Sequence, residues 1–133
     1  MIDFFGLLHY NLSAALEKGY SMEAHIFMKT KDELPACPVA ITVQLIGSKW
    51  KLLIMRNLLQ RPWRFNELRK DLEGISQKVL TDSLRSMEGD GIITRTVYAE
   101  VPPRVEYALS GLGESMRPIL DAMEQWGTNY KNS

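Results

Sequence analysis

The stretch from Phe65 to Arg95 reads FNELRKDLEGISQKVLTDSLRSMEGDGIITR and contains two short helical patterns. Apolar residues recur every three or four positions on both sides of the segment Glu73-Gly74-Ile75-Ser76, as they do in amphipathic helices. Gly74 permits the backbone conformation of a tight turn, and Ser76 is a natural N-cap for the helix that follows. The sequence therefore predicts two short helices joined by a tight turn, and few folds contain such a unit.

The second of these helices separates its side chains onto two faces. Four apolar residues are expected to point toward the core: Val79, Leu80, Leu84 and Met87. The opposite face carries polar side chains: Gln77, Lys78, Thr81, Asp82 and Arg85. The first helix is expected to begin at Arg64 or Asn66, and its apolar face rests on Phe65, Leu68 and Leu72.

The apolar period changes after Gly91. The run IITRTVYAEVPPRVEYALS alternates and is rich in β-branched and aromatic residues, which predicts a two-stranded hairpin with Arg104 at its tip. From Ser110 the helical period returns, and Pro118 is expected to kink or restart that helix. This order of elements predicts an α+β fold that is mainly α, namely a winged helix-turn-helix domain with a two-stranded wing.

The basic residues are concentrated in the middle of the chain. The 133 residues are enough for one domain, and the formal net charge is zero. Residues 47–105 carry eleven Lys or Arg against seven Asp or Glu, whereas residues 1–46 carry three against five and residues 106–133 carry two against four. The modest basic excess coincides with the two short helices and the hairpin, which favours a polyanionic partner there.

Few residues have a pattern suited to catalysis or metal binding. The single cysteine, Cys37, cannot form an intramolecular disulfide, and His9 and His25 have no metal-ligand or nucleophile pattern beside them. We therefore expect no catalytic residue, no metal and no cofactor. No signal peptide is apparent, and the apolar N-terminal segment is too short to span a membrane. A cytoplasmic protein with no membrane partner is the expectation.

A helix that enters the major groove of DNA must present donors from its first turns. The candidates for groove contacts are Ser76, Gln77, Lys78 and Thr81. The candidates for phosphate contacts are Arg85, Arg95 and Arg104, with Lys49 and Arg64 as further candidates. The double-stranded DNA of an operator is the predicted partner.

Several motifs together resemble the HxlR-type winged-helix transcription regulators, which are relatives of the MarR group. These motifs are CPV, IGSKWKLLI, RFNELRKDLEGISQKVLTDSLRSMEGDGIITR and EVPPRVEYALSGLG, and they run from about Cys37 to Trp126. Ser48 replaces the glycine that is usual in the second motif. The resemblance implies a homodimer that binds pseudo-palindromic operator DNA, with residues 76–87 as recognition helix and residues 97–107 as wing. The chain is expected to divide into an N-terminal helical extension, residues 1–36, whose first part has apolar residues at helical spacing, and a winged-helix domain, residues 37–133.

A dimer is also expected from the apolar residues at the two ends of the chain. The last helix is apolar over more than one side, and a small domain has little core in which to bury all of its large residues. The predicted interface consists of Leu7, Leu12, Met116, Leu120, Met123 and Trp126.

Two routes to regulation remain open from the sequence. Some members of the resembled family sense oxidants or electrophiles through a cysteine placed like Cys37, so this thiol is the candidate redox sensor. Alternatively, a small ligand binds in a pocket at the dimer interface. A less favoured reading is a winged helix that binds another protein and not DNA.

Overall fold

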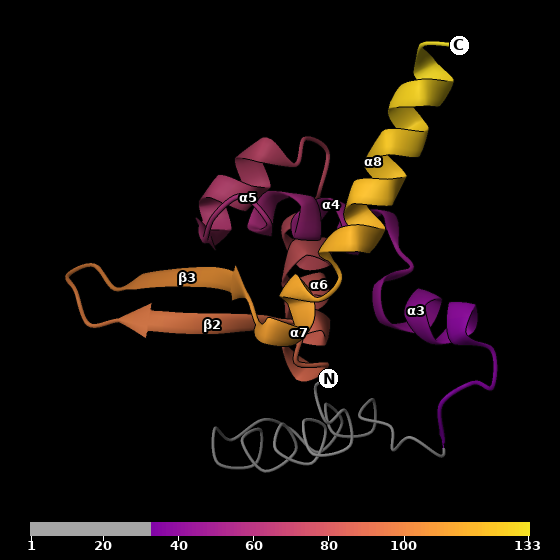
Figure 1. The fold of residues 1–133 in the computed structure, drawn as a ribbon. Helices are drawn as coiled ribbons and strands as arrows, with labels where there is room; N and C mark the ends of the chain where they lie inside the picture. Colours follow the sequence, from indigo (N-terminus) through magenta and orange to yellow (C-terminus); the bar gives the residue numbers. More distant parts are fainter. Residues whose placement is uncertain (1–32) are drawn as a thin grey trace.

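The computed structural model describes residues 33–133, which form a helical body with a projecting hairpin (Figure 1). Most of the predicted N-terminal helical extension, residues 1–36, and the interface candidates Leu7 and Leu12 lie outside the described residues. The elements follow in the order α3 (Pro38–Ile46), α4 (Lys49–Leu58), β1 (Trp63–Arg64), α5 (Phe65–Asp71), α6 (Gln77–Gly89), β2 (Ile93–Tyr98), β3 (Arg104–Leu109), α7 (Gly111–Glu114) and α8 (Arg117–Lys131). The α+β, mainly α class with a winged helix-turn-helix is confirmed.

The three strands form one antiparallel sheet in the order β1-β3-β2. The β2–β3 hairpin was predicted, and its register pairs Ile93 with Leu109 at the base and Tyr98 with Arg104 at the far end. The short strand β1 was not predicted. It pairs Trp63 with Tyr107 and so ties the start of α5 to the hairpin.

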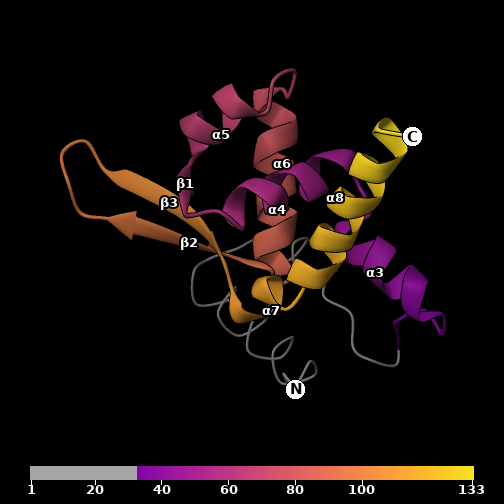
Figure 2. The same ribbon diagram turned by 45° about the horizontal axis from the view of Figure 1, so that its top comes forward.

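The core lies where α4 crosses α6, with α5 on one side of this crossing and the base of the hairpin on the other (Figure 2). Its most completely buried side chains come from α4, α5, α6 and the start of β2: Ile54, Met55, Leu68, Leu80, Leu84, Met87, Ile92 and Ile93. The hairpin projects to one side of this core and α8 to the other in both views.

Two sequence predictions about these helices have clear outcomes. The last helix does restart at the predicted proline, since α7 ends at Glu114 and α8 begins at Arg117 with Pro118 in its first turn. The prediction that Val79 points inward is wrong, because its side chain is 38% exposed. Leu80, Leu84 and Met87 already form the buried stripe, and Val79 lies about 100° around the helix from Leu80.

Candidate nucleic-acid interface

The start of α6 is held by the turn and the cap that the sequence predicts. Gly74 has a φ of 94°, in the left-handed region that favours glycine, and the chain then continues into the buried Ile75. The Ser76 hydroxyl accepts a hydrogen bond of 3.1 Å from the Val79 N–H, so Ser76 is the N-cap of α6. The first turn of α6 contains Lys78 and no acidic residue, which leaves the positive end of the helix open to an anion.

The polar face predicted for α6 is exposed as expected. Gln77, Lys78 and Arg85 are exposed, and Thr81 is half-buried. The Lys78 ammonium lies 2.7 Å from a carboxylate oxygen of Asp82, one turn further along the same face. This exposed face lies opposite the buried stripe, so the body of the domain supports α6 from behind.

Arg85 and Arg95 converge on one groove between α6 and the hairpin. The groove has a volume of about 260 Å³ and is lined by Phe65, Thr81, Leu84, Arg85, Glu88, Arg95 and Tyr107. Three predicted contact residues from two elements therefore share one concave surface, although Thr81 and Arg95 are 14 positions apart in the sequence. Two arginines against the single carboxylate of Glu88 give this groove an excess of positive charge, which suits a phosphate backbone.

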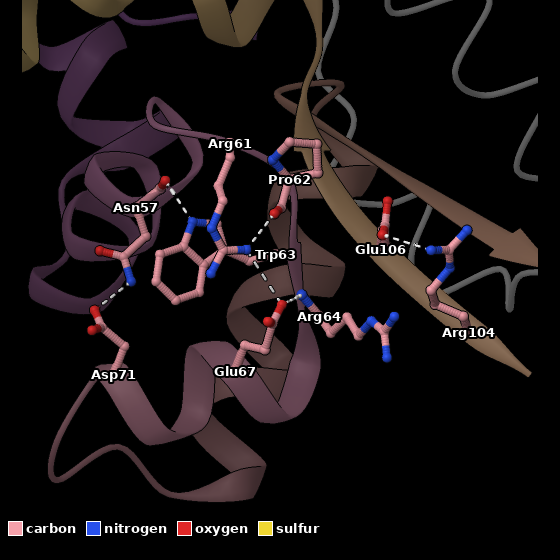
Figure 3. A network of polar contacts seen from close by, with 9 residues as sticks. All are labelled: Asn57, Arg61, Pro62, Trp63, Arg64, Glu67, Asp71, Arg104 and Glu106. Carbon is pink, nitrogen blue, oxygen red and sulfur yellow. Dashed lines mark hydrogen bonds and ion pairs between the residues drawn. The ribbon is translucent and has the colours of Figure 1, made fainter. Parts of the chain in front are cut away.

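Arg104 does not lie at the tip of the wing, and this prediction is wrong. It is the first residue of β3, and the tip is formed by residues 99–103. Its guanidinium lies 3.2 Å from Glu100, 3.7 Å from Glu106 and 4.1 Å from the ring centroid of Tyr98 (Figure 3 draws the Glu106 pair). Two carboxylates therefore neutralise the charge that was expected to reach DNA.

The other two basic candidates are exposed at the edges of the helical body. Lys49 opens α4, and its ammonium lies 4.5 Å from the centroid of the Trp50 ring. Arg64 ends β1, opposite Glu106 in the register, and its side chain points away from α5 (Figure 3). Neither lines the groove that holds Arg85 and Arg95.

A polar network that the sequence did not reveal fixes α5 against α4 (Figure 3). Asn57 is 1% exposed, and its side chain donates a hydrogen bond of 2.7 Å to Asp71 at the end of α5. Its backbone carbonyl accepts a hydrogen bond of 2.8 Å from the Trp63 indole. The network therefore connects the C-terminal end of α4 to both β1 and α5.

The start of α5 is held by a second part of this network. The backbone N–H of Arg64 donates a hydrogen bond of 2.8 Å to Glu67, and Arg61 lies 3.4 Å from the same carboxylate. The Arg64 hydrogen bond, helped by Arg61, lowers the pKa of Glu67. The Arg61 guanidinium also stacks on Trp63, at 3.8 Å from the ring centroid. Since α5 precedes the turn into α6, these contacts orient the whole helix-turn-helix.

The dimer candidates on the last helix divide into two groups. Met116 and Leu120 are 7% and 9% exposed and belong to the domain's own core, so the expectation that they meet a partner is wrong. Met123 and Trp126 are 48% and 68% exposed, and Trp126 stacks on the exposed Tyr130 at 5.3 Å between ring centroids. A helix end with three large exposed apolar side chains suits a protein–protein contact.

Cys37 is exposed and is the N-cap residue of α3. Its carbonyl accepts the first helical hydrogen bond, from Ile41 at 3.1 Å. The exposed thiol therefore stands at the N-terminal end of a helix.

Neither a metal-binding cluster nor a membrane span is found among the described residues. Within residues 33–133, no three His, Cys, Asp or Glu side chains gather as a metal site would require. None of the helices in this range is both long enough and apolar enough to cross a membrane.

An exposed polar helix, a turn that fixes it and a hairpin beside it define a winged helix-turn-helix protein. The family described as HxlR-like helix-turn-helix matches residues 45–133, and the chain belongs to this family. Its relatives and structural neighbours are transcriptional regulators, and the chain is a transcriptional regulator of the helix-turn-helix type.

Three similar proteins illustrate this relationship. The chain is 43% identical over 103 residues to the uncharacterized HTH-type transcriptional regulator YdeP of Bacillus subtilis (strain 168), covering 77% of this chain and 80% of YdeP. The structure of YtcD, an uncharacterized HTH-type transcriptional regulator of the same organism, matches with a TM-score of 0.70 and 44% identity over 73% of this chain and 99% of that one. The redox regulator HypR in its oxidised form matches with a TM-score of 0.68 and 43% identity over 70% of this chain and 96% of that one.

Proposed function

We propose that this regulator binds operator DNA as a homodimer, with α6 in the major groove of each half-site. The observation that carries the proposal is the exposed polar face of α6, which faces away from a continuous buried stripe and begins at a capped, acid-free first turn. A groove about 12 Å wide admits one such helix, and its first turns reach the base edges. Gln77, Lys78 and Thr81 are the proposed base contacts, and Ser76 contributes chiefly by capping.

The proposed phosphate contacts are Arg85 and Arg95, whose side chains line the same groove. Lys49 and Arg64 are proposed as outer contacts because both are exposed. Arg104 contributes least, since Glu100 and Glu106 already pair with it. A duplex seated on α6 and the wing would thus meet cations from two elements.

The proposed dimer uses the far end of α8. Met123, Trp126 and Tyr130 leave a large apolar surface exposed, and α8 projects from the body on the side opposite the hairpin (Figure 2). A two-fold pairing there would leave both copies of α6 and both wings accessible to one duplex.

The DNA-binding proposal is tested by titrating a labelled duplex from immediately upstream of the protein's own gene, with an unrelated duplex as the comparison. The own-gene duplex is expected to bind more tightly, and both affinities should fall steeply between 50 and 200 mM salt, with roughly 0.9 ions released per phosphate contact. Failure to bind either duplex at low salt would contradict the proposal and favour a protein-interaction module.

Thiol chemistry at Cys37 is the proposed switch. The supporting observations are the exposure of Cys37 at the start of α3 and the similarity to HypR, a redox regulator by its description. Diamide treatment is expected to change the affinity for the own-gene duplex, and Cys37→Ser should abolish that response while it retains binding.

Equal responses to diamide in the two proteins would exclude Cys37 as the switch. The search would then turn to a small ligand at the dimer interface.

A further inference from the structure

An acidic residue stands in the middle of the surface proposed to meet DNA. Asp82 lies on the exposed face of α6 with its side chain 56% exposed, one turn after Lys78, whose side chain is 84% exposed. The Lys78 ammonium and the Asp82 carboxylate lie 2.7 Å apart. A carboxylate here repels phosphates, so its position needs an explanation other than simple charge attraction.

Helix stability does not provide that explanation. Exposed ion pairs four residues apart contribute little to helix stability, and the favourable order places the acid before the base. In α6 the order is reversed, and the cation occupies the first turn, where the helix dipole opposes it. The arrangement is therefore poor for the helix.

We propose that Asp82 is a specificity-determining residue that acts through Lys78; this rests on the function proposed above. The ion pair carries no net charge, so it adds little to the sequence-independent attraction to phosphates. An ammonium has three N–H donors, and the contact with Asp82 uses one of them. The remaining donors can still reach acceptors on base edges in the groove, such as guanine O6 and N7. Asp82 thus converts Lys78 from a general phosphate anchor into a directed hydrogen-bond donor.

The test measures affinity for the operator duplex and for an unrelated duplex at several salt concentrations, with the wild type and Asp82→Asn. This substitution removes the negative charge at nearly constant side-chain size and so releases the Lys78 ammonium from its ion pair. Asp82→Asn is expected to bind the unrelated duplex more tightly, so the ratio of operator to unrelated affinity falls. Between 50 and 200 mM salt, the affinity of Asp82→Asn for the unrelated duplex should also fall about threefold more than the affinity of the wild type does. The reason is that the variant forms one more phosphate contact.

Two further variants separate the role of the pair from simple charge. The gain in affinity for the unrelated duplex that Asp82→Asn produces should largely disappear when Lys78→Gln is also present, because the freed Lys78 ammonium causes that gain. Glu124→Gln, which removes an exposed charge from α8, should leave the affinity ratio unchanged. Circular dichroism and thermal unfolding would check that each variant is folded.

The outcomes distinguish the role of Asp82 from the proposed DNA binding on which it depends. An unchanged affinity ratio in Asp82→Asn, or an equal gain with and without Lys78, would overturn the role of Asp82 while leaving DNA binding intact. Absence of binding by both the wild type and Asp82→Asn to any duplex at low salt would overturn DNA binding and this inference together.

Discussion

The side-chain amide of Asn57 donates a hydrogen bond of 2.7 Å to a carboxylate oxygen of Asp71, and this bond joins the C-terminal ends of α4 and α5. Arg56 approaches the same pair, since its guanidinium donates to the side-chain oxygen Oδ1 of Asn57 and lies 3.7 Å from Asp71. Asn57 is the one polar residue in the buried core of the described chain. The orientation of the helix-turn-helix therefore depends on a polar contact as well as on apolar packing.

Asn57→Ala should lower the free energy of unfolding by about 2 kcal/mol, because it leaves partners unpaired and opens a small cavity. Urea unfolding followed by circular dichroism measures this change. Gln60→Ala, at an exposed position just beyond α4, serves as the control and should change the free energy by less than about 0.5 kcal/mol. An equal decrease in the free energy of unfolding in the two variants would show that the Asn57 contacts do not stabilise the fold more than an exposed side chain does.

The sequence predicted the parts of the fold whose signals are local. The cap at Ser76, the turn at Gly74 and the change of period after Gly91 all lie within a few residues of the structures they specify. Strand β1 has only two residues, so no alternation could reveal it, and its pairing with β3 is set by contacts more than 40 residues away in the chain.

The site was predicted less completely, because its geometry also depends on contacts between residues far apart in the chain. The groove that holds Arg85 and Arg95 depends on how the hairpin packs beside α6. The two prolines before Arg104 suggest a position at the tip, but the strand register makes this residue the partner of Tyr98. Asn57 sits within a helical apolar pattern, and only the packing of α5 against α4 gives it a partner.

The stability of the protein should depend on pH through Asp90. Burial raises the pKa of this carboxyl from 3.8 to about 6, although Lys51 opposes the shift. Well below its ordinary pKa of 3.8 the group is protonated in both the folded and unfolded chains, and burial carries no penalty. As the pH rises to about 6 the unfolded chain ionises first, so the free energy of unfolding falls and the full penalty remains above that pH.

Asp90→Asn should therefore match the wild type in stability at about pH 3 and exceed it at about pH 7, by roughly 2 kcal/mol once partial exposure is considered. Urea unfolding at several pH values between about 3 and 7 measures the difference. Asp121→Asn on α8 is the matched control for loss of one carboxylate. A difference that does not change with pH would contradict the burial of Asp90 as the cause.

Trp126→Lys should shift the protein from dimer to monomer, because it places a charge within the exposed apolar end of α8. Analytical ultracentrifugation at micromolar concentration measures the change in mass. Val97→Lys places the same charge at another exposed apolar site, on the wing, and should leave the dimer intact. A wild type that sediments as a monomer, or a Trp126→Lys dimer, would exclude this surface as the interface.

The two wing arginines should differ in their effect on DNA affinity. Arg95→Gln is expected to weaken binding to all duplexes. It should also reduce the salt slope, which is the slope of log affinity against log salt concentration, by about one, as loss of a phosphate contact does. Arg104→Gln should change the slope much less, since Glu100 and Glu106 already pair with that guanidinium. The comparison is made by fluorescence anisotropy across a salt series. Equal slope changes would show that Arg104 leaves its carboxylates when DNA binds.

The most direct test of base reading by α6 is a selection of bound sequences from a randomised operator library, with the wild type and Gln77→Ala. Gln77 opens the exposed face, so its loss should relax base preference at one position in each half-site and leave the other positions as they were. That result would place α6 in the major groove. An unchanged preference at every position, with or without a loss of affinity, would contradict the assignment of this face as the one that reads DNA.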